Sequence, residues 1–165
     1  MIAPTEDDQL FRKQLIRGYV HDPRAAMIGG ISGHAGLFGN AGDLAKILQM
    51  MLNGGTYAGE QYLEAGTIEL FTKEYLGVPG SRRGLGFDKP EPDKSKPQNT
   101  SPDASPESFG HTGFTGNMIW ADPRNDLIYI FLSNRVYPDA ENTKLAEMNV
   151  RTQIQQLIYN AILDK

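Results

Sequence analysis

The amino-acid sequence predicts an α/β chain of the α+β type, with an antiparallel sheet of about three to four strands, a C-terminal amphipathic helix and further helices. Two runs rich in β-branched and aromatic residues flank a turn cluster in the last third of the chain. An apolar stripe at helical spacing follows them. A second helical pattern, with a suitable N-terminal cap, precedes them in the first third.

The first helix is predicted over Ala41 to Leu52. Asn40 suits the N-cap position, because its side chain can accept a hydrogen bond from a free backbone N–H of the first turn. Apolar residues follow at helical spacing, and Gly54-Gly55 ends the helix. Before it, residues 6–20 leave two alternatives open, a helix that starts after Thr5 or two short strands.

Two further elements are expected before the middle of the chain. Ile68, Phe71 and Tyr75 lie on one side of a second helix, which is predicted from about Ala65 to Tyr75. The short run from Gly84 to Phe87 is a strand candidate.

Residues 88–107 differ in composition from the rest of the chain. They contain five of the ten prolines, and Ala104 is their only apolar residue. So polar a segment buries too little apolar surface to offset the loss of chain entropy. We therefore expect a solvated, Pro-rich surface loop between two elements of one domain, of which residues 1–165 are the whole or the larger part.

The last third of the chain has the clearest strand signals. Gly116–Ala121 and Leu127–Leu132 are separated by the turn cluster Asp122–Asp126, which predicts an antiparallel hairpin. A third strand, Ser108–Thr112, leads into it. The final helix is predicted over about Asn142–Leu163. Its apolar stripe consists of Val150, Ile154, Leu157, Ile158 and Ala161.

The overall composition excludes several classes of function. The formal net charge is -4, from 16 Lys and Arg against 20 Asp and Glu, which disfavours binding to nucleic-acid phosphates. The absence of cysteine excludes disulfides, thiolate nucleophiles and Cys-ligated metals. No apolar run reaches the roughly 18 residues of a membrane span. The first residues contain no targeting signal.

Several short motifs carry weaker signals. Residues 30–34 (GISGH) come close to the nucleophile elbow G-x-S-x-G, but the fifth residue is His and no strand–turn–helix pattern surrounds them. His21, His34 and His111 lack metal-binding spacing, so no metal site is expected. The turn at His21-Asp22-Pro23 either fixes a loop or braces the rim of a site. The glycines of residues 29–36 favour close packing of backbone against backbone over an anion cradle.

The most informative string is HTGFTG at residues 111–116, between two predicted strands. A polar side chain, a hydroxyl and glycines suit a strand edge that faces a substrate, where backbone groups pair with an extended ligand. A Thr-Gly pair at a strand end also occurs in ordinary turns, so the string by itself leaves that alternative open.

The His-Thr-Gly string resembles the Lys-Thr-Gly element of serine β-lactamases and penicillin-binding proteins, in a variant with His for Lys. The segments IAPTEDD, RGYVHDPRAAMIGGISGHAGLFG, DLAKILQMMLNGG, RGLGFD and FGHTGFTGNMIWADPRNDLIYIFLSNRVYP agree with this family in order. The likeness covers nearly the whole chain and is greatest to class C-like β-lactamases, esterases and D-amino-acid peptidases. It implies a partial serine β-lactamase-like fold.

The resemblance also identifies what this sequence does not contain. The family uses a Ser-x-x-Lys nucleophile and a Tyr-x-Asn or Ser-x-Asn element, and no Ser or Tyr here has those neighbours. We therefore expect the C-terminal part of one β-lactamase-like domain, inactive alone, whose partner is the missing N-terminal part. A sheet edge left exposed predicts self-association. Family members are usually exported, which implies a parent protein in the periplasm or cell envelope.

By this resemblance, His111 and Thr112 would contact a substrate carboxylate or assist proton transfer. The backbone N–H of Phe114 would be one of two oxyanion-hole donors, and Gly113 and Thr115 would line the substrate edge. The implied reaction is attack on an amide, lactam or ester carbonyl of a small molecule or peptide through an acyl-enzyme, without a cofactor. Histidine is a weaker carboxylate anchor than Lys, which favours an esterase or peptidase over β-lactam hydrolysis. The alternative is a non-catalytic module that binds a cell-wall peptide through the same edge.

Overall fold

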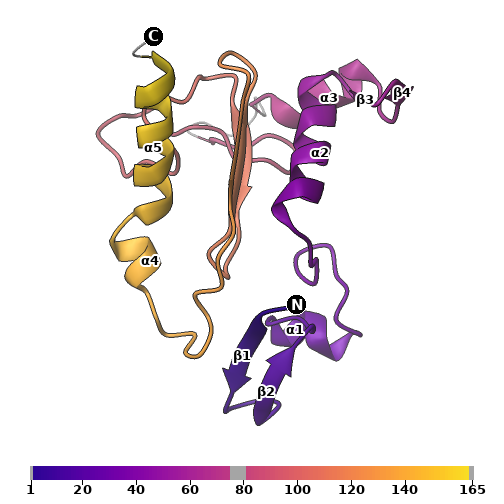
Figure 1. Cartoon of the computed structure of the whole chain (residues 1–165), viewed down its shortest axis with the longest axis vertical. Coiled ribbons are helices and arrows are strands. Elements are labelled where there is room, and N and C mark those ends of the chain that lie inside the picture. The colour runs from indigo at the N-terminus through magenta and orange to yellow at the C-terminus, as the bar shows by residue number, and fades with distance from the viewer. Residues whose placement is uncertain (1, 75–80, 164–165) are drawn as a thin grey trace.

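The structure, a computed structural model, describes residues 2–74 and 81–163 and has a three-stranded antiparallel sheet at its centre (Figure 1). Its strands β5 (Phe109–Thr112), β6 (Met118–Asp122) and β7 (Leu127–Phe131) lie in that order. The predicted hairpin and the strand that leads into it are therefore confirmed. The helices are α1 (Pro23–Met27), α2 (Ala41–Leu52), α3 (Ala65–Thr72), α4 (Lys144–Glu147) and α5 (Val150–Leu163).

Alternate residues of β6 face opposite sides of this sheet, because side chains alternate along a strand. Ala121 belongs to an apolar cluster with Leu48 of α2. Trp120 packs on the other side, where Ile158 of α5 covers it. Figure 1 shows the resulting layers, with the sheet between α2 and α5. The predicted α+β architecture is confirmed.

Helix α2 begins and ends at the predicted residues. Asn40 Oδ1 accepts a hydrogen bond from the backbone N–H of Asp43 (3.0 Å), which satisfies one of the free donors of the first turn. Gly54, with φ of +64°, follows the last turn in the left-handed conformation that commonly ends helices.

The elements around residues 56–88 differ in part from the prediction. A small hairpin, β3 (Thr56–Tyr57) and β4 (Glu60–Gln61), precedes α3. Helix α3 ends at Thr72, and the predicted end at Tyr75 lies outside the described residues.

The predicted strand over residues 84–87 is wrong. Gly84 donates to Phe87 O (2.9 Å) and closes a turn, and Gly86 has a φ of +115° that a strand cannot contain. The pairing is limited to isolated bridges, from Asp88 to Arg83 and to Gly110 of β5.

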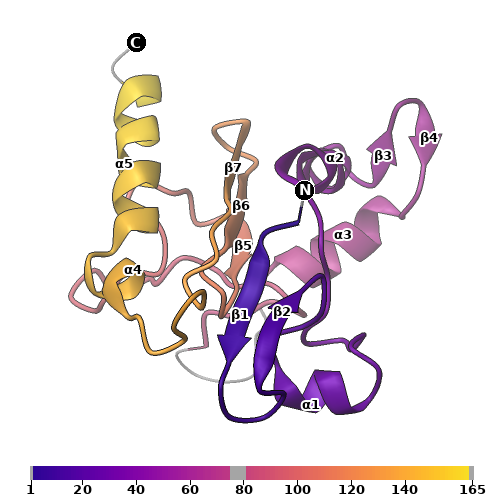
Figure 2. The ribbon, with the colours of Figure 1, turned by 60° about the horizontal axis from the view of Figure 1, so that its bottom comes forward.

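Residues 6–20 form two short strands, which resolves the alternatives left open by the sequence. β1 (Pro4–Asp8) pairs with β2 (Gln14–Arg17) in an antiparallel hairpin. Figure 2 shows this hairpin beside α1, and Figure 1 shows it below the central sheet. Asn134, which follows β7, donates a hydrogen bond to Thr5 O (3.0 Å) and attaches the hairpin to the rest of the chain.

The Pro-rich segment over residues 88–107 contains no helix or strand, but it is not solvated throughout. Thr100, Ser101, Ala104 and Ser105 are buried. Thr100 Oγ1 and the Ser101 backbone N–H both donate to Gln155 Oε1 of α5, at 2.7 and 2.9 Å. Polar contacts rather than apolar area therefore hold these residues against α5, which composition did not predict.

The predicted final helix is interrupted at Asn149, whose φ is +50°, so that α4 and α5 are separate helices. The buried side chains of α5 include Thr152, Gln155 and Tyr159. Leu157 of the predicted apolar stripe is 67% exposed, so that stripe is not the buried face. No helix in the described part of the chain is long and apolar enough to cross a membrane.

Candidate active site

The outer edge of β5 is paired at its start and open at its end. Gly110 and Asp88 exchange two backbone hydrogen bonds, at 2.7 and 3.1 Å. Gly113 instead donates its N–H toward β6, to the carbonyl of Asn117 (2.8 Å). Because backbone groups alternate between the two edges of a strand, those of Thr112 face the same edge as those of Gly110. The backbone N–H of Thr112 can therefore pair with an extended ligand at this edge, beyond Gly110.

The backbone N–H of Phe114 lies at the end of this open edge, in the turn from β5 to β6. Among the described residues, it has no hydrogen-bond partner. The neighbouring carbonyls are held in place, since Arg135 donates from Nε to Phe114 O (2.8 Å) and from its backbone N–H to Thr115 O (2.9 Å). A fixed turn with a free N–H is suited to bind a developing oxyanion.

The side chain of His111 is exposed and has a defined hydrogen-bond pattern. Its Nδ1 lies 2.7 Å from Thr112 O, and its Nε2 lies 3.2 Å from Nη1 of Arg83. Since a carbonyl only accepts and a guanidinium only donates, these partners assign the neutral tautomer with hydrogen on Nδ1.

Arg83 is a residue that the sequence interpretation missed. Its Nε forms an ion pair with the buried carboxylate of Asp88 (3.0 Å), and its exposed guanidinium lies beside His111. A permanent positive charge therefore stands next to the His-Thr-Gly string, in which His has replaced Lys. Arg83 lies far from this string in the sequence, and no local pattern connects the two.

The other predicted site residues contribute to the same edge in different ways. Thr115 Oγ1 accepts a hydrogen bond from Asn117 Nδ2 (3.2 Å), so this hydroxyl already has a partner within the turn. A Cβ added at Gly113 would meet the Asn117 side chain at 3.7 Å, an ordinary contact distance. The packing of this chain therefore does not demand glycine at position 113, and its absence of a side chain leaves the edge accessible.

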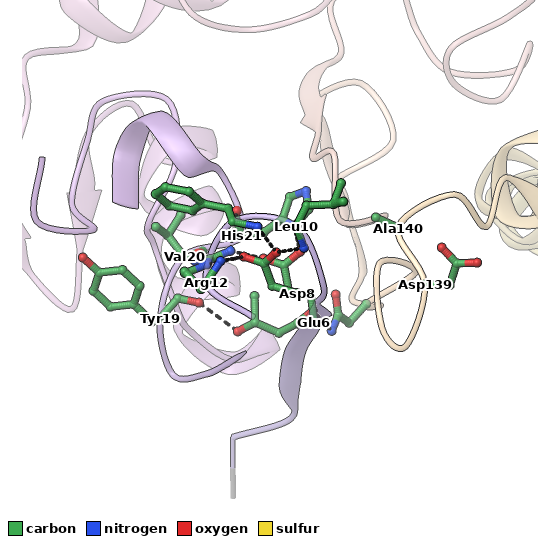
Figure 3. A network of polar contacts seen from close by, with 12 residues as sticks. Glu6, Asp8, Leu10, Arg12, Tyr19, Val20, His21, Asp139 and Ala140 are labelled. Atoms are coloured by element: carbon green, nitrogen blue, oxygen red, sulfur yellow. Dashed lines mark hydrogen bonds and ion pairs between the residues drawn. The ribbon is translucent and has the colours of Figure 1, made fainter. Parts of the chain in front are cut away.

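A polar network at the N-terminal hairpin extends to this turn. Arg12 forms ion pairs with Glu6 and Asp8 and donates to the carbonyl of His21 (3.0 Å), as Figure 3 shows. The His21 ring stacks on the ring of Phe114, with centroids 5.2 Å apart and planes 9° from parallel. The sequence left two alternatives for the turn at residues 21–23, a fixed loop or a brace at the rim of a site, and this contact bears on the second.

Asp8 is the most strongly shifted carboxyl group of this network. The hydrogen bond from the Arg12 side chain, together with backbone N–H donors that include Phe11, holds the pKa of Asp8 far below its ordinary value. Its oxygens also accept from the backbone N–H groups of Leu10 and Arg12, at 3.0 and 2.9 Å. Asp8 therefore remains ionised at neutral pH and fixes the loop between β1 and β2.

Ser32, His34 and Asp22 form a second small cluster. Ser32 Oγ lies 2.8 Å from His34 Nδ1, and His34 Nε2 lies 3.1 Å from Asp22 Oδ1. Asp22 also accepts from the backbone N–H of Ala25 and so caps α1. This N-terminal cap and the His34 contact lower the pKa of Asp22. Because the cluster is largely exposed and joins neighbouring turns, its observed role is to fix the loop.

The glycine-rich segment that contains this cluster packs as the sequence predicted. A Cβ at Gly36 would lie 2.2 Å from the carbonyl oxygen of Gly30, so the two backbone segments are in direct contact. In residues 2–74 and 81–163, no group of three His, Asp or Glu side chains is arranged to hold a metal ion.

The sequence matches known proteins over most of its length. Residues 3–151 match the family model described as Beta-lactamase. A protein of Escherichia coli K12 named "Putative D-alanyl-D-alanine carboxypeptidase" is 36% identical over 156 residues, which are 93% of this chain and 35% of that relative. A protein of the same name from Escherichia coli O157:H7 is 37% identical over 150 residues, 90% of this chain and 34% of the relative. The chain thus spans about a third of the length of these curated relatives.

Among solved structures, a crystal structure titled as a putative β-lactamase from Bacteroides dorei is similar over 77% of this chain and 44% of its own, with 15% identity and a TM-score of 0.42. The assignment of the family rests on the sequence matches, which include the edge strand with residues 111–114. The chain belongs to the β-lactamase family.

Proposed function

We propose that this chain is the C-terminal part of a serine hydrolase that cleaves an amide or ester bond through an acyl-enzyme. The observation that carries the proposal is the backbone N–H of Phe114 after β5, which has no hydrogen-bond partner in residues 2–74 and 81–163. In such a reaction the carbonyl oxygen becomes an oxyanion when the serine attacks, and preorganised N–H donors stabilise that charge. The second donor and the nucleophile belong to the longer protein, which we call the parent polypeptide.

The substrate class that we propose is a peptide with a free C-terminal carboxylate. Arg83 provides a cation beside His111, and Thr112 provides a hydroxyl on the same strand end, which together form a suitable carboxylate anchor. The names of the relatives, which specify D-alanyl-D-alanine carboxypeptidases, support the same class. An extended peptide would pair with the β5 edge and present its last amide carbonyl to the Phe114 N–H.

In this proposal the neutral His111 has a limited role in proton transfer. Its Nδ1–H donates to Thr112 O, while the lone pair of Nε2 lies next to Arg83. The ring can therefore accept a hydrogen bond from substrate or solvent only if Arg83 moves its own donor toward the carboxylate. We infer that Arg83 and His111 act as a pair, with Arg83 as the charged anchor.

The chain has no Ser-x-x-Lys sequence, so we propose that it is inactive without the preceding part of the parent polypeptide. We also propose that the parent polypeptide is exported to the cell envelope, where cell-wall peptides are found. A binding module without catalysis remains the second candidate, because the open edge of β5 would bind the same peptide in either case.

The test is release of D-alanine from a peptide that ends in D-alanyl-D-alanine, measured with the parent polypeptide. Arg83→Ala is expected to raise KM by about tenfold or more, because it removes a charged hydrogen bond to the carboxylate. His111→Ala is expected to lower turnover much more than stability. Arg124→Ala, an exposed arginine in the β6–β7 turn, is the matched control and should leave KM unchanged.

Two results would contradict the proposal. Equal effects of Arg83→Ala and Arg124→Ala on KM would remove Arg83 from the substrate anchor. Peptide binding by the wild-type parent polypeptide without any release of D-alanine would favour the binding module instead.

A further inference from the structure

The N-terminal hairpin and the candidate active site meet through one aromatic stack. His21 follows β2, whereas Phe114 lies in the turn after β5, and their rings are parallel within 9° at a centroid separation of 5.2 Å. The Phe114 ring also lies 4.4 Å from the guanidinium carbon of Arg135. Two partners therefore fix the orientation of a side chain that is otherwise 66% exposed.

His21 is itself held on both its ring and its backbone. Nδ1 lies 2.9 Å from Glu6 Oε2, an ion-pair distance at which the N–H is not aligned for a hydrogen bond. The carbonyl of His21 accepts from Arg12 Nη2 (3.0 Å), and Arg12 in turn pairs with Glu6. Figure 3 shows Glu6, Arg12 and His21 together in this network. The ring is thus a fixed surface of the hairpin rather than a free side chain.

The contacts of Phe114 restrain its carbonyl more directly than its backbone N–H. Arg135 holds the carbonyls of Phe114 and Thr115, but no partner within the described residues holds the Phe114 N–H. That N–H belongs to the Gly113–Phe114 peptide unit, whose carbonyl oxygen accepts a hydrogen bond from the backbone N–H of Gly116 (3.0 Å). Its remaining freedom follows the φ torsion of Phe114, and side-chain and backbone torsions of one residue are coupled. Restraining the ring therefore restrains the N–H.

We propose that His21 is a positioning residue that sets the orientation of the Phe114 backbone N–H through ring stacking. This inference rests on the proposed function, in which that N–H is an oxyanion donor. It assigns to the N-terminal hairpin a role in the site beyond its own stability. The hairpin does not touch the open β5 edge through His21; it acts on the turn that ends this edge.

The first experiment measures the backbone order of Phe114 in the 165-residue chain by ¹⁵N relaxation. The wild-type amide is expected near the order parameter of rigid backbone, about 0.85, and His21→Ala is expected to lower it toward the flexible range below about 0.6. His21→Phe retains a flat ring without the ring nitrogens and should restore the wild-type value. His34→Ala, which removes a histidine from the neighbouring loop without touching Phe114, is the matched control.

A second variant separates the loss of the stack from an unfolding of the N-terminal hairpin. Phe114→Leu removes the same stack at an exposed position and should lower the order of its own amide, with the β1–β2 amides unchanged. An unchanged order parameter at residue 114 in both His21→Ala and Phe114→Leu would overturn the proposal, because Arg135 and the hydrogen bond from Gly116 N–H to Gly113 O would then hold the turn without the stack.

The second experiment measures kcat and KM of the same variants in the parent polypeptide. His21→Ala is expected to lower kcat by about tenfold to a hundredfold with little change in KM, since misplaced donors lose transition-state stabilisation. His21→Phe should recover most of this loss. If residue 114 loses order but kcat is unchanged, the positioning role is wrong. If the wild-type protein has no turnover, the proposed function fails, while the relaxation data still decide whether His21 orders the turn.

Discussion

At the scale of single residues, Asp122 is the buried carboxylate at which three parts of the chain meet. It lies at the end of β6 and accepts hydrogen bonds from Ser105 Oγ (2.7 Å) of the Pro-rich segment and from Tyr159 OH (2.6 Å) of α5. The backbone N–H groups of Ser105 and Arg124 and the side chain of Asn125 also donate to it. Hydrogen-bond donors therefore compensate its negative charge, and it forms no ion pair within residues 2–74 and 81–163.

Replacing Asp122 by Asn is expected to destabilise the fold by about 3 kcal/mol, because one acceptor oxygen becomes an NH₂ group that faces existing donors. Asp126→Asn is the matched control. Asp126 is exposed in the same turn, with φ of +48°, a conformation that Asn also adopts readily. Asp126→Asn should change the free energy of unfolding by no more than about 0.5 kcal/mol. Urea unfolding followed by circular dichroism measures both, and equal losses would contradict a special role for Asp122.

The same carboxylate predicts how stability depends on pH. Burial opposes its ionisation, but hydrogen bonds from Ser105, Tyr159 and Asn125 outweigh burial and keep the pKa of Asp122 below its ordinary value of 3.8. The pKa of Asp8 is lowered as well, first by Arg12. A lowered folded-state pKa means that the unfolded chain binds more protons in acid, so this stability is complete above about pH 4 and is lost as the pH falls.

We therefore expect the free energy of unfolding of the wild-type chain to decrease between about pH 4 and pH 2. Asp122→Asn removes one of the titrating groups and should give a shallower decrease over that range. Denaturant midpoints measured at several pH values test this expectation. A variant curve parallel to that of the wild type would show that Asp122 does not contribute to the pH dependence.

At the scale of elements, Asn149 decides where α5 begins. Its φ of +50° breaks the continuous helix that the apolar periodicity predicted, and its carbonyl then accepts the first helical hydrogen bond from Gln153 N (3.1 Å). Left-handed backbone is uncommon for residues with a Cβ but is tolerated best by Gly and Asn. The break therefore has a local signal in the sequence, an Asn in the middle of the run, that periodicity alone does not detect.

This conformation predicts opposite outcomes for two substitutions. Asn149→Ala is expected to lower stability by about 1 kcal/mol, since Ala is strained at positive φ, whereas Asn149→Gly should be tolerated. Asn160→Ala, at an exposed position inside α5, is the matched control and should be neutral or slightly stabilising. Thermal unfolding compares the three variants. If Asn149→Ala is as stable as the wild type, the break between α4 and α5 is not fixed at this residue.

The elements that the sequence predicted well are those with local signals. Helix α2 has its cap at Asn40 and its glycine stop in the sequence, and β6 and β7 have apolar runs around a turn. The buried face of α5 was not predictable in this way. Gln155 is buried because Thr100 and Ser101 hydrogen-bond to it from a distant segment, and hydrophobicity carries no information about such a contact.

At the scale of the whole molecule, the candidate site lies where a central sheet and a separate N-terminal hairpin meet. The string at residues 111–114 could be proposed from the sequence because its parts are contiguous. Arg83, Arg135 and the stack of His21 were not, because each reaches the site across a turn or from another unit of the fold. A contiguous string can thus be proposed as a site from the sequence, whereas residues that contact it from distant segments require the structure.

The same architecture predicts self-association of the isolated chain. β7 is the last strand of the sheet, so its outer edge has no partner strand among the described residues, and unpaired edges are sites of strand pairing between molecules. The exposed apolar side chains of α5, such as Leu157, are an alternative surface for self-association. We expect association through the β7 edge, because backbone pairing would extend the sheet without any rearrangement.

Sedimentation velocity at increasing concentration should therefore show a growing fraction of dimer. Leu132→Lys places a charge at an exposed position directly after β7 and is expected to reduce this fraction, since charged side chains protect strand edges. Leu157→Lys makes the same substitution on the exposed side of α5 and should leave the dimer fraction unchanged. The reverse pattern would place the contact on α5, and a chain that stays monomeric at all concentrations would contradict association altogether.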